Sequence, residues 1–227
     1  CWICNSNDAN SGEHHIKASD IRRVFGNVSP DDPIYSHVKP RRRNVPVRSA
    51  KSDHLKIKKI ICTECNNVRT APYDRAWETF SAFVGQNWPD IKRTRRVKLQ
   101  KIFPGRVSKS SIDLQLYFVK LFGCRIRADD VPIDLVIFSQ SLIRRTAHPT
   151  CRLVFTIGGF GTGKMKYAGL SKIHTSERDG RPAFATWLYT LGEFHVQVFW
   201  SAEGLTTNEP KEAWAPSDGK IVKFCRK

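Results

Sequence analysis

Two Cys-x-x-Cys pairs are the residues in this sequence best suited to hold a metal ion. The pairs are Cys1/Cys4 and Cys62/Cys65, and each places two thiols at the short spacing typical of zinc knuckles. Four thiolates match the tetrahedral preference of Zn²⁺. We therefore expect both pairs to converge on one structural zinc ion, which would close a long loop of the chain.

A second group of polar residues lies within this loop and at its far end. Glu13, His14 and His15 are consecutive, and Asn66 directly follows the last cysteine. Carboxylate, imidazole and amide groups suit a hard cation such as Mg²⁺ or Mn²⁺, and a neutral imidazole can take a proton from water. We expect Glu13, His15 and Asn66 to hold a catalytic cation, with His14 or His15 as general base.

The order of these motifs resembles that of the HNH nucleases of the ββα-metal class. In members with a zinc knuckle, the first Cys pair precedes an acidic-or-His/His pair on a strand, and Asn follows the second pair at the start of a helix. Here Cys1/Cys4, Glu13 to Ile16, and Cys62/Cys65 with Asn66 take those places, over roughly the first third of the chain. The resemblance implies a metal-dependent endonuclease hydrolysing phosphodiester bonds, with restriction or antiviral defence as fitting contexts.

The roles of the two adjacent histidines stay open. Ser19 lies five residues after His14, as in many relatives, which favours His14 as base, while a His14-His15 register is the alternative. Lys17 stands where the family often has proline, and the family's central Asn has no clear equivalent. Two other functions remain: a zinc-knuckle module that binds nucleic acid without cutting it, and an effector nuclease subunit that is active only with a partner.

The charge of the chain indicates a polyanionic partner. Its 227 residues carry 38 Lys and Arg against 21 Asp and Glu, a net charge of +17, which fits nucleic acid, and double-stranded DNA in particular. The basic residues that we expect to contact phosphate are Arg69, Arg41, Arg42, Arg43, Lys92, Arg93, Arg95 and Arg96.

Hydropathy predicts no membrane segment. No apolar run approaches the ~20 residues needed to span a bilayer, and the N-terminus lacks a signal-peptide pattern. Cys124, Cys151 and Cys225 are left over after the two pairs, which indicates buried thiols in a reducing compartment rather than a disulfide framework. The expected location is the cytoplasm.

The pattern along the chain predicts an α+β protein. Residues 1–88 would form a zinc-stapled ββα-metal (HNH) domain with a long insertion loop at 20–53, because that stretch is polar and rich in proline. Residues 89–110 would be a basic connector. Residues 111–227 would form a smaller, β-rich α+β domain that binds substrate or a protein partner.

Specific elements follow from local patterns. Residues 54–61 predict a strand pairing with the His14 strand, and Pro72 predicts the first turn of a helix that stops at Gly85 and Pro89. A second helix is expected from Ser110 and Ser111 to Gly123. Two hairpins are expected further on, 151–157 with 165–170 and 184–191 with 194–200.

Overall fold

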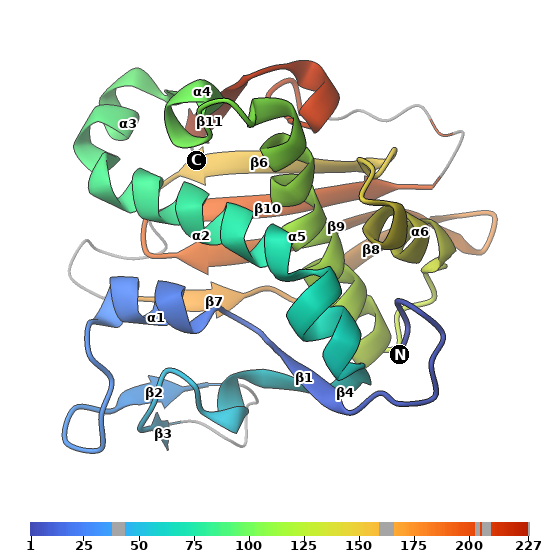
Figure 1. Ribbon diagram of the computed structural model, residues 1–227, viewed down its shortest axis with the longest axis horizontal. Helices are drawn as coiled ribbons and strands as arrows, with labels where there is room; N and C mark the ends of the chain where they lie inside the picture. Colours follow the sequence, from blue (N-terminus) through green and yellow to red (C-terminus); the bar gives the residue numbers. More distant parts are fainter. Residues whose placement is uncertain (38–43, 159–165, 203–204, 206–209, 227) are drawn as a thin grey trace.

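The computed structural model describes residues 1–37, 44–158, 166–202, 205 and 210–226 (Figure 1). Helices and strands are both abundant, and they form the mixed α+β architecture expected from the sequence. The described residues form a large sheet, a layer of helices on one side of it, and two small two-stranded sheets, one of which carries Glu13 and His14.

The main sheet has seven strands. Their order is β5-β11-β6-β10-β9-β7, and β8 also pairs with β9. The β11–β6 pair is parallel and the other pairs are antiparallel. The bounds are Arg96–Lys98 (β5), Cys151–Ile157 (β6), Ala168–Leu170 (β7), His174–Arg178 (β8), Arg181–Leu191 (β9), Phe194–Ser201 (β10) and Ile221–Arg226 (β11).

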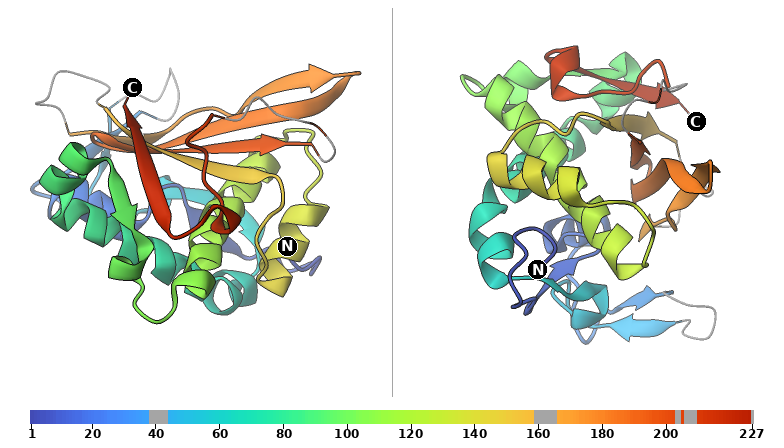
Figure 2. Two further views of the ribbon diagram at one scale, coloured as in Figure 1. Left: turned by 90° about the horizontal axis from the view of Figure 1, so that it is seen from above. Right: turned by 90° about the vertical axis from the view of Figure 1, so that its right-hand side faces the viewer.

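Two long helices cover one face of this sheet (Figures 1 and 2). They are α2, Ala71–Gln86, and α5, Val107–Ala128, and α5 is buried on nearly every side. Trp77 of α2 lies at the centre of the packing, stacked on Tyr117 at 5.4 Å and edge-on to Tyr189 of β9 at 5.6 Å between ring centroids. The remaining helices are Ala18–Phe25 (α1), Trp88–Thr94 (α3), Leu99–Ile102 (α4) and Val136–Arg144 (α6).

The small sheet is a pair of antiparallel strands, β1 (Ser11–His14) and β4 (Lys56–Ile61). His14 pairs with Lys56, which confirms that the strand before the second Cys pair lies against the His14 strand. The π-helical turn Cys65–Arg69 follows, and then α2 begins with Pro72 in its first turn as expected. Strands β1 and β4 and helix α2 therefore follow in that order along the chain, with α1 and the hairpin at 34–47 between the two strands.

The expected insertion loop at 20–53 is wrong as a description of this stretch. It contains most of α1 and a short hairpin of Ile34–Ser36 (β2) with Val45–Val47 (β3). The buried Asp20 carboxylate fixes α1, because it accepts hydrogen bonds from Trp77 Nε1 and Tyr189 Oη, both at 2.7 Å. Because this stretch is polar, the sequence did not predict α1, which is held in place by the buried Asp20 carboxylate.

The segment 89–110 is more than a connector. It contains α3, α4 and the edge strand β5, and its buried Val97 and Leu99 belong to a continuous cluster of hydrophobic side chains that extends from Ile3 to Phe224. The expected boundary between residues 88 and 111 therefore does not separate two hydrophobic cores.

The second expected helix has different ends. It begins at Val107, before Ser110, and continues past Gly123 to Ala128. Gly123 does not end the helix because it is the point where the Trp2 ring packs: a Cβ there would lie 2.5 Å from Trp2 Cη2.

One of the two expected hairpins forms. Strands β9 and β10 pair across Gly192 as predicted. Strand β6 instead pairs with β10 and β11, and β7 pairs with β9, so a hairpin between 151–157 and 165–170 is wrong. The turn expected between them lies largely at 159–165, outside the described residues.

Candidate metal centre and charge network

The four cysteines of the two pairs come together. Their Sγ atoms all lie within 4.8 Å of one another, and Cys4 Sγ is 3.7 Å from Cys62 Sγ. Cys1 and Cys4 lie in the turn before β1, while Cys62 follows β4 and Cys65 opens the π-helical turn. Hydrogen bonding between the strands therefore brings the two distant pairs together, and the cluster can hold a metal ion such as Zn²⁺.

The protonation of these thiols shows what metal binding would require. Burial raises the pKa of Cys65 to about 12, and the neighbouring thiols act in the same direction. The Cys65 backbone N–H donates to Cys62 Sγ at 3.4 Å and lowers the pKa of Cys62. Because zinc binds thiolates, metal binding would release the protons of this cluster.

Asn66 contacts the strand that carries the histidines, but it does so at the start of that strand. Its Nδ2 donates to Ser11 Oγ at 2.9 Å and to the Gly12 carbonyl at 3.2 Å. These bonds fasten the π-helical turn to β1 at Ser11 and Gly12. The amide therefore ties together the two segments that bear the cysteine pairs.

Glu13 belongs to a buried network of charges. Its Oε2 lies 2.9 Å from Nζ of Lys120, a lysine of α5 whose side chain is 0% exposed. The same ammonium lies 3.0 Å from Asp74 Oδ1 of α2. Lys17 continues the network with contacts of 3.1 Å to both Asp74 and Glu78. Three separate elements, β1, α2 and α5, are joined through these ion pairs.

The charges of the partners determine how this network titrates. Burial by itself would lower the pKa of Lys120, but Glu13 and Asp74 outweigh that effect and raise it. Burial raises the pKa of Glu13, and the charge of Lys120 opposes the rise. We therefore describe Lys120 as an ammonium ion shared by two carboxylates.

His14 and His15 are both neutral near pH 7. Burial lowers the pKa of His14 to about 4, and the charges of Lys56 and Lys17 add to this. Burial also lowers the pKa of His15 to about 4, with a contribution from Arg125 of α5. Nδ1 of His14 is buried and lacks a hydrogen-bond partner among the described residues, whereas the backbone N–H of His15 donates to Leu55.

The expected cation set does not fit this arrangement. Glu13 already binds the Lys120 ammonium. A divalent cation between Glu13 and Asp74 would have to displace Nζ of Lys120, because both carboxylates contact it. Among the described residues, the four cysteines are the only group of three or more His, Cys, Asp and Glu side chains close enough to share an ion.

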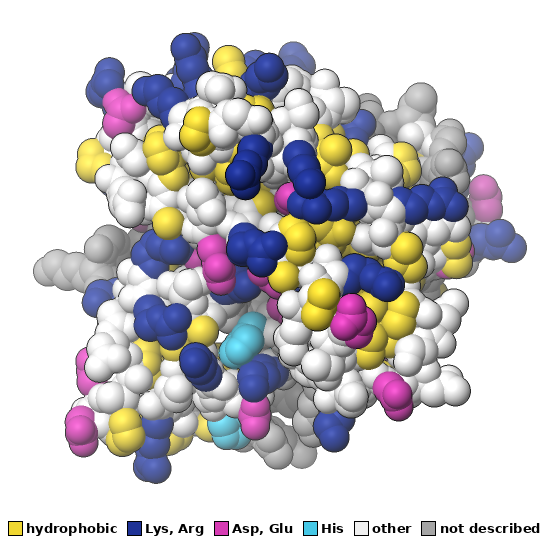
Figure 3. All heavy atoms as spheres, in the orientation of Figure 1, with side chains coloured by type: hydrophobic (Ala, Val, Ile, Leu, Met, Phe, Trp, Pro, Cys, Tyr) yellow, Lys and Arg dark blue, Asp and Glu magenta, His cyan; other side chains and the backbone are white. Residues whose placement is uncertain are grey.

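The expected phosphate contacts are dispersed. Arg69 is half-buried in the π-helical turn, and Arg41, Arg42 and Arg43 lie outside the described residues. The exposed basic residues of 92–96 lie at the end of α3 and the start of β5, where Lys92 pairs with Glu193 at 3.1 Å and Arg93 with Asp90 at 2.5 Å. Basic side chains are spread over the face that α2 and α5 present, with acidic ones among them (Figure 3).

Lys120 was not predicted from the sequence, although a signal for it exists. It is a single charged residue in an otherwise apolar stretch, Leu116 to Phe122, and a lysine buried in a helix requires partners. Asp74 could also be read as an exposed helix residue, but the structure gives it two lysine partners. Lys17, which stands where the HNH family often has proline, also belongs to this charge network, because it pairs with Asp74 and Glu78.

Comparison of the chain with protein-family models, with curated proteins and with solved structures finds no match in any of the three.

Proposed function

We propose that this protein is a nucleic-acid phosphodiesterase of the HNH type that acts on DNA. One observation carries the proposal: β1 ends at His14 and pairs with β4, and β4 leads into α2 through Cys62 and Cys65 of the four-thiol cluster. The resemblance implies two paired strands followed by a helix beside a zinc site, and this arrangement supports the proposal, although α1 and the β2–β3 hairpin lie between β1 and β4. The net charge of +17 supports a polyanionic substrate.

His14 would act as the general base. It is half-buried, and its pKa of about 4 keeps the imidazole neutral, so that the ring could take a proton from an attacking water. Because the residues around Glu13 fit an ammonium ion rather than a divalent metal, no step is assigned to a bound cation. Exposed basic residues such as Arg95 and Arg96 would contact the phosphate backbone.

Plasmid cleavage by the purified protein tests this function. We expect nicking or linearisation of supercoiled DNA, measured on gels with Mg²⁺, with Mn²⁺ and with EDTA. His14→Ala should remove cleavage, whereas His54→Ala, which alters an exposed histidine close by in the chain, should retain it. Full activity in His14→Ala together with loss in His15→Ala would instead assign the base to His15.

A second function is favoured by the ion pair of Glu13. If the Lys120 ammonium stays bound to Glu13, the chain is a zinc-knuckle module that binds nucleic acid without cutting it. In that case the wild type binds DNA with a strong dependence on salt but leaves the plasmid intact under all three conditions, and His14→Ala binds DNA as tightly as the wild type.

A further inference from the structure

The face of the main sheet turned away from α2 and α5 carries two phenylalanines. Phe184 of β9 and Phe199 of β10 are both half-buried, and their ring centroids are 6.4 Å apart with 41° between the planes. The residues next to them in the strands, such as Ala185 and Val198, are buried on the opposite face. The two long helices lie on that opposite face, so the two rings offer flat apolar surface on a side that neither helix covers (Figure 2).

Strand register places other useful side chains beside these rings. Arg152 of β6 is opposite Phe199, Phe199 is opposite Thr186, and Thr186 is opposite His174 of β8. Side chains at opposite positions share a face at about 5 Å spacing. A guanidinium, a ring, a hydroxyl and an imidazole thus form one row across four strands.

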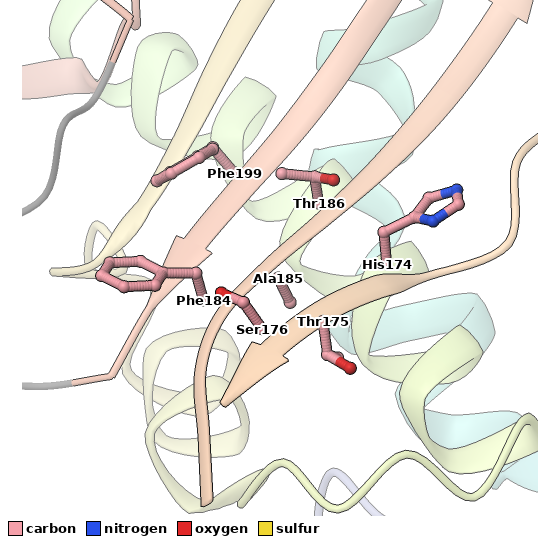
Figure 4. Close-up of a pocket in the computed structure, with 7 residues that line it drawn as sticks. All are labelled: His174, Thr175, Ser176, Phe184, Ala185, Thr186 and Phe199. Atoms are coloured by element: carbon pink, nitrogen blue, oxygen red, sulfur yellow. The ribbon is translucent and has the colours of Figure 1, made fainter. Parts of the chain in front are cut away.

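This row borders a shallow pocket of about 450 Å³. Phe184, Phe199, Thr186 and His174 line it together with Ser176 (Figure 4). The mixture of flat rings and hydroxyl groups suits a ligand that is flat, partly apolar and edged with hydrogen-bonding groups. A nucleobase has these properties.

The charges on the same sheet suit the phosphates of such a ligand. Beyond Arg152, Lys223 of β11 pairs with Arg96 of β5, and both side chains are exposed. Glu177 is the one acidic residue within the seven strands. Asp179 follows in the β8–β9 turn, and Glu193 in the β9–β10 turn pairs with Lys92, so the acidic residues nearest to β8, β9 and β10 lie at the ends of these strands. An anionic strand crossing from β9 toward β5 would meet basic groups.

We infer that this sheet face binds single-stranded nucleic acid by stacking bases on Phe184 and Phe199. Sequence-tolerant binding of single strands combines aromatic platforms with basic side chains that contact the backbone, and this face offers two rings and the basic residues Arg152, Lys223 and Arg96. Paired bases in a duplex do not expose their flat faces, so the rings select unpaired strands. The inference rests on the proposed function for the ligand class, nucleic acid, and is otherwise independent of His14.

Fluorescence anisotropy with a labelled oligonucleotide of about ten thymidines tests the inference. Each of Phe184→Ala and Phe199→Ala should weaken binding by about tenfold or more, the loss expected for one stacked base. Tyrosine at either position keeps a ring and should bind like the wild type. Tyr35→Ala, which removes an exposed aromatic side chain of β2, is the matched control and should have no effect.

Leucine variants test the same stacking contact if an alanine variant fails to fold. Phe184→Leu and Phe199→Leu retain apolar volume without a flat ring, and thermal unfolding checks that they fold. Unchanged binding of the single strand by folded leucine variants, or an equal loss for duplex and single strand, would overturn the inference. So would sedimentation showing a dimer that the leucine variants abolish, since a second copy would then occupy the face.

Single-strand binding and phosphodiester cleavage can be lost separately. If His14→Ala loses cleavage but binds the oligonucleotide normally, both stand. If the wild type cuts nothing but the ring variants lose single-strand binding, only the phosphodiesterase activity is refuted.

Discussion

At the scale of single residues, Lys120 decides what the candidate site can hold. A fully buried lysine is costly unless its charge is compensated, and here Glu13 and Asp74 compensate it at 2.9 and 3.0 Å. The same two carboxylates would otherwise be the natural oxygen ligands for a hard cation. The ammonium therefore occupies the place where the sequence predicts a metal.

Lys120→Met tests this occupancy. The substitution leaves Glu13 buried without its partner, and we expect the free energy of unfolding to fall by about 3–5 kcal/mol, measured by urea denaturation. Mg²⁺ should restore part of that loss, because the two freed carboxylates can then bind a cation, while the wild type should not respond to Mg²⁺.

Lys92→Met is the matched control, since Lys92 makes an exposed ion pair with Glu193. Its loss should cost no more than about 1 kcal/mol, with no response to Mg²⁺. Equal stabilisation of the wild type by Mg²⁺ would show that a cation binds with Lys120 still in place.

At the scale of elements, local patterns were sufficient where one segment determines its own structure. Strand β4, helix α2 and the β9–β10 hairpin follow from alternation, a proline in the first turn and a glycine turn. The pairing of β6 with β10 and β11 depends on distant segments. The continuation of helix α5 past Gly123 does so too, because Trp2 packs against Gly123. Where the sequence did not predict the strand pairing or the extent of a helix, contacts between segments far apart in the chain determine them.

Gly123→Ala tests the contact between α5 and the first Cys pair. Helix propensity alone predicts that alanine stabilises a helix interior by roughly 0.5–1 kcal/mol. We expect the opposite, a loss of about 1–3 kcal/mol, because the new Cβ would meet the Trp2 ring at 2.5 Å. Bound metal should also decrease, since Trp2 lies between Cys1 and Cys4.

Thermal unfolding and metal content measure these effects. Lys109→Ala, at an exposed position in the same helix, serves as control and should stay within about 0.5 kcal/mol of the wild type. A higher melting temperature for Gly123→Ala would mean that the Trp2 ring moves aside without cost.

At the scale of the whole molecule, the cysteine cluster is the part of the site that sequence reasoning predicted best. Spacing alone identified four ligands, and the structure brings all four within 4.8 Å. The surrounding chemistry was less accessible, because Glu13 obtains its partner from Lys120, a residue more than a hundred positions away on α5. The spacing of a sequence motif can identify residues that lie together, such as the four cysteines. It cannot identify a buried charged residue on another element, such as Lys120 of α5.

A metal bound by the cluster would fasten the N-terminal segment to the rest of the chain, and Cys62→Ser measures that effect. A cross-link between Cys4 and Cys62 removes loop-closure entropy from the unfolded chain, which for a loop of this length corresponds to about 4 kcal/mol. We expect the variant to lose its bound zinc, measured by elemental analysis, and to unfold at a lower urea concentration. Cys225→Ser, outside the cluster, should keep both properties. A chelator should bring the wild type down to the midpoint of Cys62→Ser and leave that variant unchanged, because the metal and not the thiol supplies the cross-link. If the chelator lowers both midpoints equally, the stabilising metal lies elsewhere and the four thiols are only packed together.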